Sequence, residues 1–270
     1  YDTLDGGAGD DVLDGGNYKR ARGNYVTDIY KFDKNYGFDR IFNFFSSDIA
    51  ESYGGGTYSN YEAGVRGDKI MIPNDVVSSA RSIIDSSSNN ADGFAHLQFS
   101  GTEIVIHMLS KEQLKPEYFY ITPRTSNNII GTTDNDYLIG TNSNDKIQGT
   151  INPFAIEDNG SDFIEGGEGD DILIGGPAER SNGGYASDKY RFNDDFGHDY
   201  LISFFAEDIS PGYSQYRNPD GEGAAKLSDK LEFNNIFGST ATDLINKASD
   251  NEDGWAVITL GANSLTIYGI

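Results

Sequence analysis

A nine-residue repeat of glycine and aspartate is the feature that most limits what this chain can fold into. Residues 6–16 read GGAGDDVLDGG, and residues 166–176 read GGEGDDILIGG. Glycine reaches backbone angles that a Cβ hinders, so the first six residues of each copy predict a turn whose carbonyl groups point inward. The last three residues alternate around one apolar residue, which is typical of a very short strand with one buried side chain.

A longer repeat, at an offset of 160 residues, divides the chain into two copies of one module. Residues 28–32 match residues 188–192, and residues 68–70 match residues 229–231 with one inserted position. Self-similarity over this length predicts two units with the same fold. We expect a first module, a linker and a second module at residues 1–124, 125–130 and 131–270.

The charge of the chain indicates what it binds. Asp and Glu total 43, Lys and Arg total 20, and the formal net charge is -23. So much negative charge repels itself in a compact state unless something neutralises it. DNA, RNA and anionic membrane surfaces are therefore poor partners. The carboxylates recur in register with the glycines, which favours a bound divalent cation over an acidic surface that is merely solvated.

Several kinds of site are excluded or receive no support. The chain has no cysteine, which excludes disulfides and thiolate metal sites. It has no apolar stretch of about 18 residues, so we expect no membrane span. His96, His107 and His198 are scattered through strand-like segments without zinc-site spacing, and no nucleophile or nucleotide motif occurs. We therefore expect a non-catalytic module, whose parent protein could still be an enzyme.

The repeat matches the pattern G-G-x-G-x-D-x-U-x, and the chain resembles the RTX, or haemolysin-type, calcium-binding repeat proteins. The resemblance is close over both repeat tracts and looser over the segments that follow them, which resemble the caps of such tracts. It implies a mainly all-β fold of two tandem modules. Each module would be a short calcium-binding parallel β-roll followed by an antiparallel β cap with one short helix. The chain departs from the pattern where threonine follows Gly131, Gly140 and Gly149, and where two turns carry long insertions.

The resemblance also implies a set of calcium ligands. Calcium takes six to eight oxygens at about 2.3–2.6 Å, more than one turn supplies. In the family the ion lies between two stacked turns. Carbonyls at positions two and four and the position-six aspartate of one turn face carbonyls at positions one and three and the position-six aspartate of the next. Carried over to this sequence, the ligands are Asp2, Gly7, Gly9, Asp11, Gly15, Asn17, Asp28, Asp39, Thr132, Asp134, Asp136, Thr141, Ser143, Asp145, Gly149, Asp162, Gly166, Gly167, Glu168, Gly169, Asp171, Gly175, Asp188 and Asp199. The alternative, aspartates that only cap turns, needs no paired glycines.

Outside the repeats, aromatic and β-branched segments predict strands, and two segments with a helical stripe predict one short helix in each module. In the first module the expected strands are residues 29–32, 40–45, 69–72, 95–99 and 103–108. The expected helices are residues 75–84, capped by Asn74, and residues 241–248, capped by Ser239 or Thr240. The Tyr-rich segments 51–67 and 209–225 would suit contact with carbohydrate, although plain surface loops are the simpler interpretation.

The leading functional interpretation is a calcium-binding RTX module that folds on extracellular calcium as part of a type I-secreted bacterial toxin, adhesin or exoenzyme. The sequence starts without Met and inside a repeat, so we expect the rest of a longer polypeptide around it. The alternative is a calcium-dependent module that binds a polysaccharide or a cell-surface ligand, like the auxiliary modules of alginate-modifying epimerases.

Overall fold

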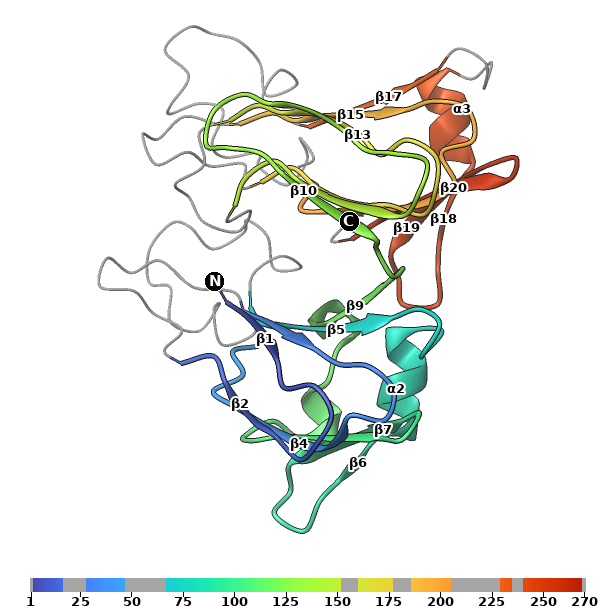
Figure 1. Ribbon diagram of the computed structural model, residues 1–270. Helices are drawn as coiled ribbons and strands as arrows, with labels where there is room; N and C mark the ends of the chain where they lie inside the picture. Colours follow the sequence, from blue (N-terminus) through green and yellow to red (C-terminus); the bar gives the residue numbers. More distant parts are fainter. Residues whose placement is uncertain are drawn as a thin grey trace, which may run out of the picture. The chain divides into compact units, whose positions relative to one another are not determined.

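The structure is a computed structural model that describes residues 2–16, 28–46, 67–151, 160–176, 186–204, 229–234 and 240–268 (Figure 1). The two Tyr-rich segments lie outside the described residues, apart from Gly67. The chain divides into two compact units. Unit 1 is Tyr1–Pro123 with Glu252–Gly254, and unit 2 is Arg124–Asn251 with Trp255–Ile270. Within the described part of the chain, no helix has the length and apolar character needed to cross a membrane.

Unit 1 contains two sheets, and successive strands of the repeat tract alternate between them. The first sheet is parallel throughout and consists of β1 (Thr3–Asp5), β3 (Ile29–Lys31), β5 (Lys69–Pro73) and β9 (Phe119–Thr122). The second sheet is parallel from β2 (Val12–Asp14) through β4 (Gly37–Phe42) to β8 (Thr102–Ile106), and continues antiparallel through β7 (Ala95–Phe99) to β6 (Ser88–Asn89).

Unit 2 repeats this alternation. One sheet orders β11 (Tyr137–Ile139), β13 (Phe163–Glu165), β15 (Lys189–Phe192) and β17 (Lys230–Phe233), all parallel. The other orders β10 (Asn127–Ile130), β12 (Asp145–Gln148), β14 (Ile172–Ile174), β16 (His198–Ile202), β20 (Asn263–Ile267), β19 (Ala256–Leu260) and β18 (Ala248–Asp250), with only the last two pairings antiparallel. The fold is therefore mainly β, with the parallel sheets typical of a β-roll.

The residues expected to form a linker belong instead to unit 2. Residues 127–130 are strand β10, which pairs in register with β12. The reason is the apolar side chain at the centre of each short strand: Ile129 aligns with Ile147, which in turn aligns with Leu173. The division between the units falls at Pro123 and Arg124, a few residues before this strand.

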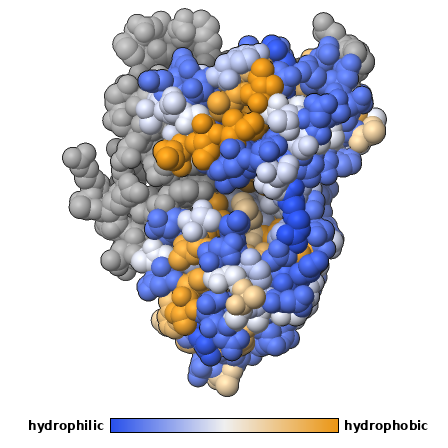
Figure 2. Space-filling model, in the orientation of Figure 1, coloured by the Kyte–Doolittle hydropathy of each residue, from blue (hydrophilic) through white to orange (hydrophobic). Residues whose placement is uncertain are grey.

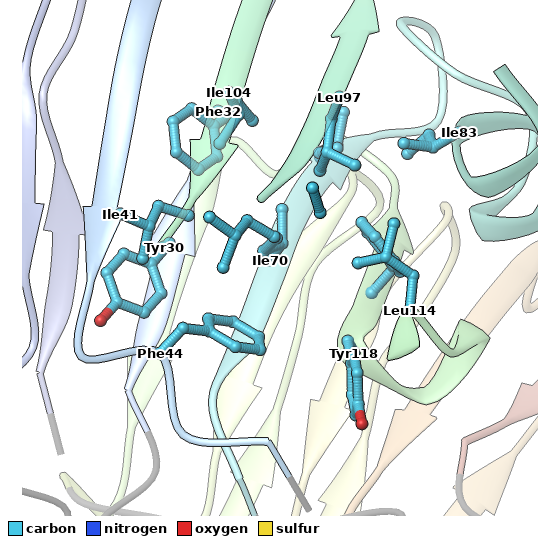
Figure 3. Packing of buried hydrophobic residues seen from close by; sticks show 14 of the residues in the cluster. Tyr30, Phe32, Ile41, Phe44, Ile70, Ile83, Leu97, Ile104, Leu114 and Tyr118 are labelled. Atoms are coloured by element: carbon cyan, nitrogen blue, oxygen red, sulfur yellow. The ribbon is translucent and has the colours of Figure 1, made fainter. Parts of the chain in front are cut away.

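The core of each unit is the space enclosed by its two sheets. In unit 1, Tyr30, Ile41, Ile70 and Ile104 come from four strands and point toward one another (Figure 3). All four side chains are fully buried. Burial of one such side chain is worth about 1.5–3 kcal/mol, so one inward residue per short strand is enough to hold the stacked strands together.

The described residues contain one α-helix in each unit, and the helix of unit 1 begins later than predicted. α2 (Ala80–Ser86) is capped by Ser79, whose side chain accepts a hydrogen bond from the Ser82 N–H at 3.1 Å. The prediction of a helix from residue 75 with Asn74 as its cap is wrong, because the Val76 N–H donates to the Pro73 carbonyl and the chain turns there.

α3 (Ala241–Asn246) begins as predicted, and Thr240 is its cap, within a capping box with Asp243. It ends before residue 248, because Ala248 starts β18. Unit 1 has two further short helical turns, η1 (Lys111–Gln113) and η2 (Pro116–Tyr118), which lead into β9.

The surface matches the polar composition of the chain. Figure 2 shows hydrophilic residues over most of the described surface visible in that view, with apolar residues gathered in smaller areas. The large apolar residues that the described part of the chain exposes are Val12, Met108, Ile130, Tyr137, Ile139, Ile151 and Ile245. Several of them lie on the first strands of a roll, where one side of the strand has no neighbour in the sheet.

Candidate metal centre: stacked aspartate turns

The position-six aspartates form hydrogen-bonded columns along the rolls. The N–H of each aspartate donates to Oδ1 of the aspartate in the next stacked turn, for example from Asp145 to Asp171 at 2.8 Å and from Asp171 to Asp199 at 3.0 Å. Unit 1 has the columns Asp2–Asp28–Asp68 and Asp11–Asp39. Unit 2 has the columns Asp136–Asp162–Asp188–Asp229 and Asp145–Asp171–Asp199.

Several of these carboxylates are buried without the partners that an anion needs. Asp39, Asp171 and Asp199 are 1%, 0% and 1% exposed. Their Oδ2 atoms, and that of Asp11, are buried and have no hydrogen-bond partner among the described residues. Burial raises the pKa of Asp171 to about 7 and that of Asp199 to about 9. A buried carboxylate is stable only when it is protonated or paired with a cation, so these oxygens fit a bound metal ion.

Backbone carbonyl groups point into the same gaps between turns. A Cβ added at Gly140 would overlap with the Gly166 carbonyl, which belongs to position one of the next stacked turn. From the other side, a Cβ at Gly167 would overlap with the Thr141 carbonyl, at position two of the turn before. Only glycine leaves room for these carbonyls. Each gap is thus lined by carbonyl and carboxylate oxygens from two turns, a donor set that suits a hard cation such as calcium.

The family comparison agrees with this donor set. A model of the RTX calcium-binding nonapeptide repeat matches four copies, over residues 1–17, 125–150 and 158–177. The chain carries RTX calcium-binding nonapeptide repeats. The matched residues include both turns that form the gap described above, at residues 140–145 and 166–171.

A comparison with solved structures also gives a match. The extracellular lipase LipA from Serratia marcescens is similar over 99% of this chain and 36% of the lipase chain, with 17% sequence identity and a TM-score of 0.28. The chain therefore spans about a third of the length of that protein. No curated protein matches the sequence.

In unit 2 the structure places the ligands carried over from the RTX family in facing turns. The Glu168 N–H donates to the Thr141 carbonyl at 3.1 Å, and a Cβ at Gly169 would lie 2.8 Å from the carbonyl carbon of Ser143. In the other column of turns, Gly131 lies against the Gly149 carbonyl and Gly149 against the Gly175 carbonyl. The Asp134 carbonyl lies 2.7 Å from the Cβ position of Gly160, just before Asp162. Gly166 and Gly175 each lie against the aspartate of their own turn, Asp171 and Asp188.

In unit 1 the facing turns are fewer. Gly9 of the complete RTX turn meets the turn that ends at Asp39, where its N–H donates to the Tyr36 carbonyl at 2.7 Å. Gly7, in the same turn, has open space around its Cβ position. The Asp2 N–H donates to Asp28 Oδ1, and the Cβ position of Gly15 lies 2.7 Å from Asp28 Oδ2. Asn17, the remaining predicted ligand, lies outside the described residues.

The turns that end at Asp39 and Asp199 adopt the RTX backbone without its paired glycines. Gly7 and Gly9 have φ angles of 78° and 137°, and at the same two places Asn35 and Gly37 have φ angles of 58° and 104°. In unit 2, Asp195 and Gly197 have φ angles of 54° and 76°. Asparagine and aspartate tolerate this left-handed region better than other non-glycine residues, which explains how the second glycine can be replaced there.

Two aspartates of the columns were not in the predicted set. Asp68 and Asp229 are 1% and 6% exposed, and each accepts the N–H of the preceding aspartate of its column, at 2.9 and 2.8 Å. Both precede the apolar centre of a strand by two residues, as position-six aspartates do. This spacing could have revealed them, although no glycine turn comes before them.

Position-five residues make a second set of hydrogen bonds between turns. In these, the N–H of the later turn donates to a side chain of the earlier turn, which is the reverse of the aspartate columns. Asn144 Oδ1 accepts the N–H of Asp170 at 3.0 Å, and Asp170 Oδ1 accepts the N–H of His198 at 2.9 Å. In unit 1, Asp10 Oδ1 accepts the N–H of Phe38 at 3.0 Å. Where both contacts occur, two side chains tie a turn to its neighbour.

The side-chain ligands come in pairs. Within the described ranges, no group of three or more His, Cys, Asp or Glu side chains could hold a metal ion. Two aspartates, one from each turn, supply the charge at a gap, and the backbone carbonyls supply the other oxygens. Side chains alone therefore do not make up such a site.

Proposed function

We propose that this chain is a non-catalytic, calcium-dependent folding module of a larger bacterial protein that is exported by type I secretion and folds outside the cell. The observation that carries the proposal is the set of buried Oδ2 atoms in gaps lined by backbone carbonyls. Calcium ions in these gaps would neutralise the charge of the buried carboxylates. Toxins, adhesins and exoenzymes are the candidate parent proteins.

The chemistry explains why such a module would respond to its compartment. With a net charge of -23, the chain without calcium gains little from closing its aspartate columns. Extracellular calcium sites typically bind at about 10⁻⁴–10⁻³ M, far above cytosolic calcium levels. Because the gaps exist only when turns stack, the free energy of binding contributes directly to folding.

The test is circular dichroism and thermal unfolding of the 270-residue chain during a calcium titration, with magnesium as the control. We expect β structure and melting temperature to increase with calcium and much less with magnesium, because magnesium demands near-octahedral geometry and loses water reluctantly. A spectrum and a melting temperature that a chelator leaves unchanged would rule out the proposal.

A second candidate function is calcium-dependent binding of a polysaccharide. It is favoured by an aromatic stack on the outer face of the β11–β13–β15–β17 sheet. Tyr137, which is 62% exposed, stacks on Phe163 with ring centroids 4.5 Å apart, and the Arg191 guanidinium lies 4.5 Å from the Phe163 ring. Flat aromatic faces beside a cation suit sugar rings that carry carboxylates.

The measurement for this candidate is binding of alginate by the calcium-loaded chain and by Tyr137→Ala. Tyr137 is exposed, so its replacement should leave the fold intact. Equal binding by the two proteins would remove this face from consideration. Tyr58 and Tyr61, in the Tyr-rich segment 51–67 considered above for contact with carbohydrate, would then be the next side chains to change.

A further inference from the structure

The position-six aspartates differ in what satisfies their second oxygen. At Asp11, Asp39, Asp171 and Asp199 the Oδ2 atom is buried and has no hydrogen-bond partner among the described residues. We call these aspartates open. Asp11 with Asp39 and Asp171 with Asp199 are consecutive in their columns, so these four aspartates form two stacked pairs, one in each unit.

In other aspartates of the columns, Oδ2 accepts a hydrogen bond from a protein donor. We call these aspartates closed. Asp136 Oδ2 accepts the N–H of Thr132 at 2.5 Å and its hydroxyl at 2.9 Å. Asp145 Oδ2 accepts the N–H of Thr141 at 2.5 Å, and its Oδ1 accepts Nδ2 of Asn127 at 2.5 Å. In each of these turns, the donor is the threonine that replaces glycine at position two.

Asp68 is closed in a different way. Its Oδ1 accepts the Asp28 N–H at 2.9 Å and its Oδ2 accepts the Phe45 N–H at 2.8 Å, while its own N–H donates to the Phe45 carbonyl at 2.8 Å. Both oxygens of this buried carboxylate are therefore used within unit 1. The column ends here in a contact that needs no ion.

The residue at position two differs between the open turns of Asp11 and Asp171 and the closed turns of Asp136 and Asp145. Gly7 and Gly167 have φ angles of 78° and 102° in the turns of Asp11 and Asp171. Thr132 and Thr141 are not among the residues with positive φ, which is the region that a β-branched residue avoids. In the threonine turns the N–H of position two meets the carboxylate of its own turn, and in the glycine turns no such contact occurs.

We propose that calcium binds most tightly where two open aspartates stack, at Asp11–Asp39 and Asp171–Asp199. We further propose that Thr132 and Thr141 weaken their sites by closing Asp136 and Asp145. This inference rests on the proposed function and assigns an order to its sites. An ion at a closed aspartate must compete with a charge-assisted hydrogen bond. The loss of such a bond corresponds to about a ten- to hundredfold weaker affinity.

The first test counts ions. Isothermal titration calorimetry and native mass spectrometry of the whole chain should show a tight class of two ions, one per open pair. Asp39→Asn and Asp199→Asn should each remove one ion from this class. Asp145→Asn, at a closed aspartate, should change the tight class by less than threefold. Asp85→Asn, on the exposed face of α2, controls for the loss of one negative charge.

The second test opens a closed turn. Thr141→Gly removes the constraint at position two, and Asn142→Gly adds a glycine at the next position of the same turn. We expect Thr141→Gly to add one ion to the tight class, or to tighten a weak site about tenfold, while Asn142→Gly does neither. This gain is measurable even where the aspartate variants fold poorly.

The outcomes separate the two proposals. If the wild-type chain binds no calcium, the proposed function fails and this inference fails with it. If the wild-type chain binds calcium but Asp39→Asn and Asp199→Asn keep the tight class intact, only the assignment of the open pairs is overturned. Equal calcium affinities for Thr141→Gly and Asn142→Gly would overturn the role of threonine.

Discussion

Both units contain aspartate columns of the same kind, but the rolls of the two units end differently. In unit 1, β9 joins the sheet beside β5, and the segment before it adds Leu114, Tyr118 and Phe119 to the core. In unit 2, the equivalent sheet ends at β17 as far as the structure describes it. The shared part holds the proposed calcium sites, whereas the part that unit 1 adds is apolar. Among the described residues, unit 1 therefore has packing beyond its roll that does not depend on calcium.

The same difference changes the environment of one lysine. Lys69 and Lys230 both follow the last aspartate of a column and both begin a strand that continues with Ile or Leu. Lys69 is 0% exposed, and its Nζ lies 5.8 Å from the ring of Tyr120 on β9. Lys230 is exposed. Similar local sequence thus leads to opposite burial, because β9 lies over Lys69 whereas no described strand lies beyond β17.

The largest expected effect comes from calcium removal. Without the ion each strong site forfeits about 4 kcal/mol at a thousandfold excess of calcium over its dissociation constant. We expect a chelator to abolish hydrogen-exchange protection in β14 and β16 at a lower concentration than in β5 and β9, because apolar residues before and in β9 pack onto β5. Simultaneous loss of protection in both units would contradict the difference drawn between them.

The next effect concerns the apolar packing that β9 and the segment before it add to unit 1. Phe119→Ala should destabilise unit 1 by about 3–5 kcal/mol, since Phe119 is fully buried in the core and its removal leaves a cavity. Urea unfolding followed by hydrogen exchange should show the loss in unit 1 and leave the protection of β14 unchanged. A loss spread over both units would show that they unfold as one.

A smaller effect is expected at the closed end of the unit 1 column. Asp68→Asn removes one acceptor and leaves the buried Phe45 N–H without its partner, which costs about 1.5–3 kcal/mol. Because both oxygens of Asp68 are used by backbone groups, the number of bound calcium ions should stay the same. Calorimetry that shows one ion fewer would mean that Asp68 is a ligand.

The smallest effect is a pH dependence that only one unit should show. Burial lowers the pKa of Lys69 to about 8. Since the folded pKa lies below the unfolded value of about 10.4, stability should rise with pH between about 8 and 10, by at most about 1 kcal/mol per pH unit, and should not change with pH below that window. Lys69→Met should remove this rise, and Lys230→Met should not. Identical pH profiles for wild type and Lys69→Met would show that Lys69 stays protonated.

Local spacing explains what could be predicted. The turns, the short strands and most of the candidate ligands follow from nine consecutive residues, because glycine at positive φ and one inward side chain are local requirements. The start of α3 could be predicted for the same reason, since its cap and capping box lie within four residues. The start of α2 was missed, because both Asn74 and Ser79 can cap a helix and only the turn after β5 decides between them.

Local sequence specifies which residues can make an RTX turn and where the aspartates stand within it. Which turns meet depends on the folded chain, because hydrogen-bonded aspartates lie 26, 28, 40 or 41 positions apart, according to how much chain intervenes. In the folded chain, residues 127–130 form a strand where a linker was expected, one column ends at Asp68, and Lys69 is buried. The physical reason is the same in each case: burial and carboxylate pairing depend on neighbours that are distant in the chain, and no local pattern specifies them.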